Sequence, residues 1–372
     1  MSTQRRKIGF VLLSRVSDPI PSTRIAVLNM QEHLRAAGFA PHVVFEPERN
    51  TETPNLEGLA AKVKALGIDL VYFQKVRGPS VLESVREMRG LGIKTVYGVC
   101  DLVEPDMAEA ADATITVTDY LRSLYPASLQ HKIHVVHDGI ERPALEKTSW
   151  AAHRGSILNP LNAVLVTSVA LDRLPVLGRP PNWLRVTVVG RFPDRGDRLQ
   201  RMREAWWQMA GKRGWQERWE FARFLAMPNV RRVAWDAEGV YAEMQKADIG
   251  IIPIATEPGD RALAGWRVKS ENRLTLKMSM GLPVVATPIP AYEPVVRQGV
   301  NGFLARSHKE WLECLSVLRD PQVRRAVGQR ARADALAGFS MDLQADKLCR
   351  VLHDVLETDE PDGSGKLPVK QL

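Results

Sequence analysis

The sequence predicts an α/β protein built from two doubly wound parallel sheets. With 372 residues, the chain is long enough for two domains of ordinary size. In each half, short apolar runs alternate with segments of helical periodicity, which is the pattern of βαβ units in a parallel sheet. A polar stretch with proline near both ends separates the two series. We therefore expect two separate cores.

The first series predicts strands joined by amphipathic helices. Ser22 or Thr23 is expected to cap the first helix, and Gly38 to close it. Gly67 and Gly92 stand where the next helices should end. The predicted strands are 7–13, 41–46, 69–74, 94–99, 112–118 and 132–140, and the predicted helices are 22–38, 56–67, 80–92 and 119–125.

The second series repeats this alternation with different spacing. One long helix is expected from Leu199 to Leu225, and the last part of the chain is read as helical. The predicted strands are 162–171, 184–190, 229–235, 248–254, 282–287 and 301–305, with further helices at 237–246, 270–280 and 309–357.

These elements divide the chain into predicted domains. An N-terminal Rossmann-like domain covers 1–145, a linker 146–162 and a C-terminal Rossmann-like domain 163–340, followed by a helix at 341–357. Residues 358–372 have the composition of a disordered tail. Ligands of such open sheets bind beyond the carboxyl ends of the strands, so we expect the site in a cleft that both domains face.

Composition restricts the class of protein. The three cysteines are widely spaced and form no CxxC pattern, which predicts reduced thiols and no metal site. No apolar run is long enough to span a membrane, so we expect a cytoplasmic protein, with peripheral attachment to the inner membrane face as a second option. The net charge of +8 suggests an anionic partner such as a nucleotide, a phospholipid surface or a nucleic acid.

The segment from Ala247 to Ala305 carries the most specific pattern. A strand containing proline is followed by a helix ending in MSMGLPVVA, then by TPIPAYEPVV and GVNGFLA. This order resembles the donor-binding region of family 4 (group 1) glycosyltransferases, which have the GT-B fold of two Rossmann-like domains. The resemblance implies transfer of a sugar, with retention of configuration, from a nucleotide diphosphate sugar.

The sequence departs from that family at two acidic donor-site positions, which fall on Val268 and Leu276. A Lys-Ser-Glu-Asn-Arg run at 269–273 stands there instead, and two cations near a helix start suit a phosphate. The cations are four residues apart, so a helix would place them on one face. The turn after Ala286 should present N–H groups to a diphosphate. The predicted donor residues are Lys269, Ser270, Asn272, Arg273, Arg191, Pro288, Ile289, Pro290, Ala291, Tyr292 and Glu293.

The N-terminal half offers candidates for the acceptor side. Asp101 follows a predicted strand where relatives have a residue lining the reaction centre, so we expect a catalytic role; capping of the next turn is the alternative. His137 matches a turn at the end of the family's N-terminal domain, where a structural role competes with a functional one. Ser22, Thr23 and Arg24 either face a ligand or cap a helix.

A basic, tryptophan-rich segment supplies much of the net charge. Between Arg185 and Arg232 there are about twelve lysines and arginines against five acidic residues, roughly +7. Leu199, Met202, Trp206 and Met209 follow helical spacing, which favours a stripe facing the core. A helix lying on a phospholipid surface combines the same residue types and is the competing interpretation.

The predicted function is glycosyl transfer to a glycan or lipid-linked acceptor, for polysaccharide biosynthesis. The nucleotide sugar is a co-substrate, and we expect no cofactor, no metal and no nucleic acid partner. A nucleotide-sugar epimerase or hydrolase of the same fold and a non-catalytic nucleotide-binding protein remain alternatives. A Rossmann dehydrogenase is disfavoured because no GxGxxG follows the first strand of either half.

Overall fold

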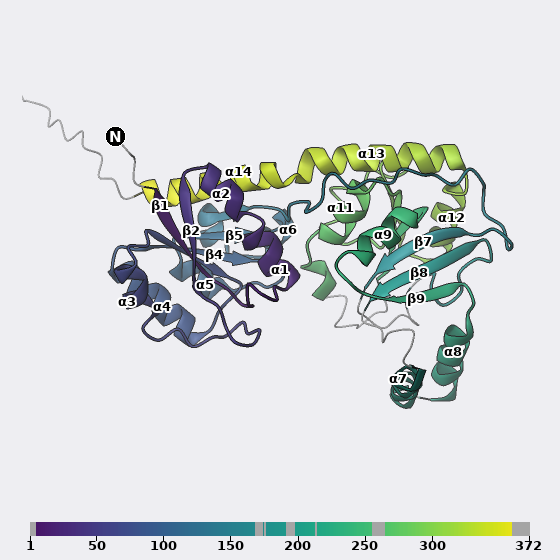
Figure 1. The fold of residues 1–372 in the computed structure, drawn as a ribbon, viewed down its shortest axis with the longest axis horizontal. Coiled ribbons are helices and arrows are strands. Elements are labelled where there is room, and N and C mark those ends of the chain that lie inside the picture. Colours follow the sequence, from purple (N-terminus) through teal and green to yellow (C-terminus); the bar gives the residue numbers. More distant parts are fainter. Residues whose placement is uncertain are drawn as a thin grey trace, which may run out of the picture. The chain divides into compact units, whose positions relative to one another are not determined.

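The computed structural model describes residues 5–167, 174, 176–190, 198–212, 214–254 and 265–358. The chain divides into two compact units, Met1–Gly139 with Met341–Leu372, and Ile140–Ser340 (Figure 1). Each unit contains one six-stranded sheet, and the recorded strand pairs are parallel. The prediction of two parallel-sheet α/β domains is therefore confirmed. The segment 146–162, expected to link the domains, is included in the second unit.

The sheet of the first unit has the order β2-β1-β3-β4-β5-β6. Its central strands are buried on both faces, as their uninterrupted apolar sequences require. The strands are β1 (Arg6–Val11), β2 (Phe39–Phe45), β3 (Leu70–Gln74), β4 (Lys94–Val99), β5 (Ala113–Thr116) and β6 (Ile133–Val135). Because all run in parallel, the loops after β1, β3 and β4 meet at one edge.

The first predicted helix, 22–38, is broken into three pieces. A short α1 (Pro21–Thr23) runs into a π-helical turn (Arg24–Leu28), and α2 (Gln31–Ala36) follows. Ile20 is the N-cap, so Ser22 and Thr23 lie inside the first turn and the capping prediction for them is wrong. Gly38, Gly67 and Gly92 have φ of 89°, 63° and 73°, which confirms them as helix-ending glycines.

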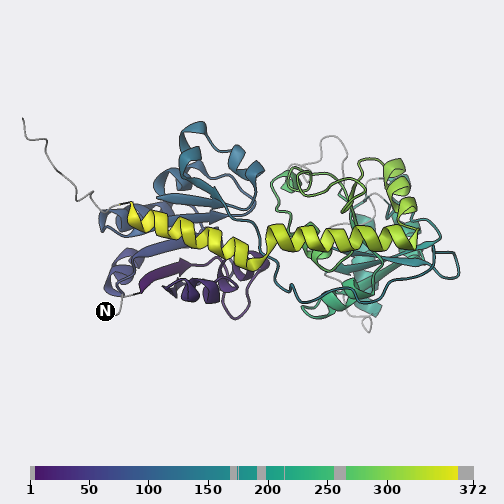
Figure 2. The same ribbon diagram turned by 90° about the horizontal axis from the view of Figure 1, so that it is seen from above.

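The other helices of the first unit cover the sheet. They are α3 (Leu59–Ala65), α4 (Pro79–Gly90), α5 (Pro105–Ala110), α6 (Asp119–Ser123), a 3-10 helix (Ala127–Lys132) and α14 (Met341–Glu357). Figure 2 shows α14 lying across the strands of this unit. Ala345, Leu348 and Leu352 lie on one face of α14 and pack with β1, β3 and β4 in a single core. Helix α14 thus completes the core of the first unit.

The second unit has the sheet order β12-β11-β10-β7-β8-β9. Its strands are β7 (Leu161–Val166), β8 (Leu184–Gly190), β9 (Val230–Ala234), β10 (Ile249–Ile252), β11 (Val284–Ala286) and β12 (Phe303–Leu304). Its helices include α9 (Gly239–Lys246), α11 (Asn272–Ser279), α12 (His308–Val317) and α13 (Pro321–Phe339). Ser307 caps α12, and Asp320 caps α13 ahead of Pro321.

The long helix expected from Leu199 to Leu225 is two helices, α7 (Arg198–Ala210) and α8 (Trp215–Ala226). The predicted core-facing stripe is wrong for Leu199, Met202 and Trp206, which are exposed; Met209 packs against the core. Phe221 and Phe224 of α8 are the buried residues instead, because they project from the opposite side of α8 to its tryptophans.

Candidate functional site

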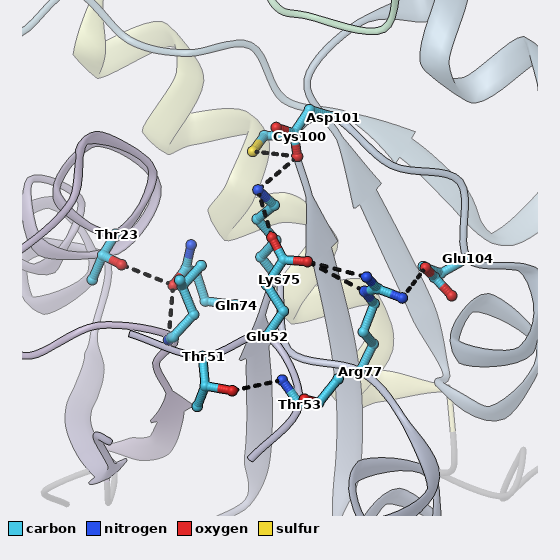
Figure 3. A network of polar contacts seen from close by, with 11 residues as sticks. Thr23, Thr51, Glu52, Thr53, Gln74, Lys75, Arg77, Cys100, Asp101 and Glu104 are labelled. Atoms are coloured by element: carbon cyan, nitrogen blue, oxygen red, sulfur yellow. Dashed lines mark hydrogen bonds and ion pairs between the residues drawn. The ribbon is translucent and has the colours of Figure 1, made fainter. Parts of the chain in front are cut away.

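A chain of alternating charges lies at the carboxyl edge of the first unit's sheet (Figure 3). Lys75, directly after β3, contacts Asp101 at 2.8 Å and Glu52 at 3.0 Å. Arg77 contacts Glu52 at 3.3 Å and Glu104 at 3.0 Å. Three loops that are distant in the sequence are therefore held together by ion pairs. The arrangement gathers carboxylates and cations at one edge of the sheet.

The backbone of Lys75 is strained. Its φ is 59°, in the left-handed region that side chains other than glycine rarely adopt. Such a conformation costs on the order of 1–3 kcal/mol and persists only when surrounding contacts impose it. Here the Lys75 N–H donates to the Gly98 carbonyl at 2.8 Å while its ammonium meets two carboxylates. These contacts hold the strained backbone of Lys75 and keep its ammonium between the two carboxylates.

Lys75 remains protonated in this environment. Burial lowers its pKa, but the nearby Cys100 and the hydrogen-bonded carboxylates of Asp101 and Glu52 raise it more, so the pKa lies above its ordinary value. A permanent cation holds Asp101 in place. Asp101 follows β4, as expected, and its Oδ1 also accepts from the Cys100 thiol at 3.5 Å. Its catalytic role stays a prediction.

A small pocket opens beside this network, with a free volume of about 30 Å³, room for one or two water molecules. Lys75 and Cys100, which contact Asp101, both line it. The floor includes the Tyr72 ring, which crosses Gly98 so closely that a Cβ there would overlap the phenol. Its other polar lining residues are Ser22, Gln74, His137 and Asp138.

The predicted acceptor-side residues are placed differently from one another. Ser22 and His137 line the pocket. Thr23 is fully buried, and its hydroxyl donates to Gln74 Oε1 at 3.0 Å. Arg24 opens the π-helical turn. The Nδ1 of His137 lies 3.0 Å from the Val117 carbonyl, which can only accept, so Nδ1 carries a proton.

In the second unit, the donor-side candidates gather at the start of α11. Asn272 is its first residue, so Lys269 lies before the helix, and the argument that places it on one helical face with Arg273 is wrong. Arg273 is partly buried with its guanidinium 4.6 Å from the centre of the Trp266 ring. Burial lowers its pKa. Ser270 is half-buried and Lys269 is exposed.

The turn after β11 offers few amide donors. The N–H groups of Tyr292 and Glu293 donate to the Ile289 carbonyl, and Pro288 and Pro290 have none. The amides of Ile289 and Ala291 are the ones that no described hydrogen bond uses. The exposed Glu293 pairs with Arg306 at 3.2 Å. Burial raises the pKa of Tyr292, and the nearby Arg273 opposes this only in part.

Two buried charged residues of this region were not predicted from the sequence. Lys277 is fully buried on α11, with its stem across Gly250 and its Nζ 3.3 Å from the Arg273 carbonyl. The sequence does contain a signal for this burial, because Lys277 stands three residues after Leu274 and a helix places both on its buried face. Glu271, the N-cap of α11, is also buried.

Arg191 lies outside the described residues. Within the described part, no cluster of His, Cys, Asp or Glu could hold a metal ion.

Two family models match the sequence. One, described as glycosyl transferase family 4 group, matches residues 21–145. The other, described as glycosyl transferases group 1, matches residues 168–319 and includes α11 and the turn after β11. Together they span most of the chain. The chain belongs to the group 1, family 4 glycosyltransferases.

Solved structures show the fold of this glycosyltransferase. A glycosyltransferase from Rickettsia africae has a TM-score of 0.69 at 13% identity, over 96% of this chain and 100% of that one. HepE from Anabaena, in complex with UDP-glucose, has a TM-score of 0.62 at 17% identity, over 94% and 99%. Sucrose-phosphate synthase from Thermosynechococcus elongatus gives 0.58 at 14%, over 94% and 99%. The glycosyltransferase therefore has the GT-B fold. No curated protein matches its sequence.

Proposed function

We propose that this glycosyltransferase uses a uridine diphosphate sugar as donor and a glycan or lipid-linked glycan as acceptor, with retention of the anomeric configuration. The neighbour HepE binds UDP-glucose, which supports a uridine nucleotide. The family match supports a nucleotide-activated donor in the second unit. A sugar transfer of this kind is a step of glycan assembly on a carrier, as in polysaccharide biosynthesis.

The observation that carries the donor proposal is the environment of Arg273. Among the described residues, no carboxylate forms an ion pair with it, and its guanidinium is held against Trp266. A cation that is partly withdrawn from water and held in place binds a diphosphate more strongly than a solvated one. Arg273 also stands in the first turn of α11, where the helix dipole favours an anion. Lys269, Ser270 and Asn272 border it in sequence.

On the acceptor side, the ion-paired edge of the first unit supports a role in binding the transferring sugar or the acceptor. Glu52 and Asp101 are carboxylates fixed by Lys75, and fixed carboxylates accept hydrogen bonds from sugar hydroxyls. During transfer, the bond between the anomeric carbon and the diphosphate oxygen breaks, the acceptor hydroxyl oxygen bonds to the same carbon on the same face, and the hydroxyl proton passes to the departing diphosphate. The charge that develops on the departing diphosphate is what Arg273 would stabilise.

A thermal-shift panel tests the donor. UDP-glucose, GDP-mannose, ADP-glucose and a CMP sugar are each titrated against the protein, and we expect the uridine compound alone to raise the melting temperature. A ligand present at about a hundred times its Kd stabilises the folded protein by roughly 2.7 kcal/mol, which is readily detected. A shift with another nucleotide would overturn the base assignment, and no shift with any would overturn donor binding.

The reaction itself is tested with the preferred donor and a panel of glycan and lipid-linked acceptors. Proton NMR of the product should show the anomeric configuration of the donor. Product of the opposite configuration would contradict retention. Rapid release of free or epimerised sugar in the absence of acceptor would favour the hydrolase or epimerase alternative.

A further inference from the structure

Helices α7 and α8 of the second unit carry a large apolar surface that the protein leaves uncovered. Trp206, Trp207, Trp215 and Trp219 expose 62%, 64%, 80% and 61% of their surface. Leu199 and Met202 are exposed as well, at 81% and 70%. We call these six residues the tryptophan surface. Exposed clusters of large apolar side chains mark sites of interaction.

The tryptophan surface is not needed for folding of the second unit. Phe221 and Phe224 of α8 are buried in the core, and Met209 of α7 packs against the same cluster. In α8, the two phenylalanines lie on the side of the helix opposite Trp215 and Trp219. The core side of α8 is thus complete. A second apolar side on a helix needs another environment to cover it.

Two exposed arginines lie on the same helices as these aromatic side chains. Arg203 and Arg218 are exposed on the same two helices, and the segment from Arg185 to Arg232 carries roughly +7. Within the second unit, α7 and α8 lie next to each other below β9 in the view of Figure 1. The surface therefore combines indole rings and positive charge at a projecting end of this unit.

We infer that the tryptophan surface binds the interface of an anionic phospholipid bilayer. Indole rings favour the boundary between acyl chains and headgroups, and arginines are drawn to lipid phosphates. A second copy of the chain fits less well, because a symmetric interface would bring Arg203 and Arg218 close to the same cations of the partner. No helix in the described part of the chain is long and apolar enough to cross a membrane, so attachment is peripheral.

This inference goes beyond the proposed function and does not rest on it. Attachment would bring the enzyme to a lipid-linked acceptor, yet the surface is made of residues other than those assigned to the donor. Binding to vesicles without any substrate therefore tests it alone.

The experiment is vesicle co-sedimentation of the full chain. Vesicles of phosphatidylcholine alone are compared with vesicles containing about 30% phosphatidylglycerol, at low and high salt. We expect binding to the anionic vesicles that is at least tenfold weaker in high salt or without phosphatidylglycerol. Replacing Trp206, Trp207, Trp215 and Trp219 by Ala should weaken binding at least tenfold. Trp235→Ala, at a tryptophan outside the two helices, should bind as the wild type does.

Two further measurements keep the outcome decisive. The fourfold variant should keep the wild-type melting temperature, because its changes are exposed, and Arg203→Gln with Arg218→Gln should lose binding without loss of any indole. Wild-type binding by both variants would overturn the inference. Absence of binding at low salt would also overturn it, as would light scattering that shows a dimer abolished by the fourfold variant.

Discussion

Arg273 is the residue on which the proposed donor site depends most. Its guanidinium stacks on Trp266, and a contact between such a cation and phosphate contributes roughly 1.5–3 kcal/mol. Arg273→Ala should therefore weaken binding of the nucleotide sugar and of the free nucleoside diphosphate by about ten- to a hundredfold. The nucleoside without phosphates should bind as before. Calorimetric titration of the three ligands measures the difference.

Arg325 provides the matched control for this prediction. It is exposed on α13 of the same unit, so Arg325→Ala removes one cation from the unit without touching α11. Both variants lower the net charge equally, and only Arg273→Ala should lose affinity. Equal losses for nucleoside and diphosphate would indicate general damage to the fold. Unchanged affinity for the diphosphate would place the phosphates elsewhere.

Asp101 is the second residue with a testable role. Asp101→Asn keeps the shape of the side chain but removes the charge that pairs with Lys75 at 2.8 Å. We expect turnover to fall far more than donor affinity, because the residue belongs to the first unit and the donor is assigned to the second. Steady-state kinetics with the true acceptor, beside donor titration, separates the two effects.

Lys75→Met shows whether Asp101 acts directly or through the network. If the carboxylate itself contacts the sugar, Asp101→Asn should be the more damaging change. Equal loss in both variants would assign Asp101 to positioning. Asp106→Asn, at an exposed residue of α5, should keep full turnover. Wild-type turnover by Asp101→Asn would remove Asp101 from the site.

One buried side chain of helix α11, that of Lys277, lowers the stability of the fold. Lys277 is fully buried, and burial, with the nearby Arg273, lowers its pKa to about 7. In the unfolded, solvated chain a lysine has its ordinary pKa, 10.5. Between these values the folded state binds fewer protons than the unfolded state, so this residue makes stability rise with pH from about 7 to about 10. Below pH 7 both states are protonated and the full cost of burying the charge remains.

Lys277→Met should therefore stabilise the protein, by on the order of a few kcal/mol at pH 7 and below. The gain should shrink as the pH rises from 7 and should be smallest above about 10.5, where the lysine is neutral in both states. Urea unfolding of both proteins at each pH measures it. Lys64→Met, at an exposed lysine of α3, should leave stability nearly unchanged. A gain that is the same at every pH would contradict the depressed pKa.

The elements show what sequence periodicity can predict. Strands such as β3 and β4 were predicted because their apolar runs reflect burial on both faces. The break at the π-helical turn Arg24–Leu28 and the division of α7 from α8 were not, because periodicity continues through both. The edge network was also missed, since Glu52, Lys75 and Asp101 meet only through the order of parallel strands.

At the scale of the whole molecule, the first unit is made from two distant pieces of chain. Leu352 of α14 is fully buried in the core formed with β1, β3 and β4. Leu352→Ala should destabilise this unit by about 2–5 kcal/mol, the usual cost of such a cavity. Hydrogen exchange followed by mass spectrometry should show faster exchange in peptides of the first unit.

Leu66→Ala is the control, because Leu66 is half-exposed at the end of α3 and its truncation leaves no cavity. Exchange in the second unit should stay as in the wild type for both variants. Faster exchange confined to peptides of the second unit would contradict the assignment of α14 to the core of the first unit.

The position of α14 has a consequence for synthesis of the protein. Residues 1–139 are translated before the second unit, and Met341–Glu357 only after it. At about 5–20 residues per second, the apolar face that α14 covers stays open for roughly 10 to 40 seconds on each nascent chain. The second unit, continuous from Ile140 to Ser340, can complete its fold first. The first half to be translated is thus the last to finish folding, and the open face of its sheet is where a chaperone would be needed.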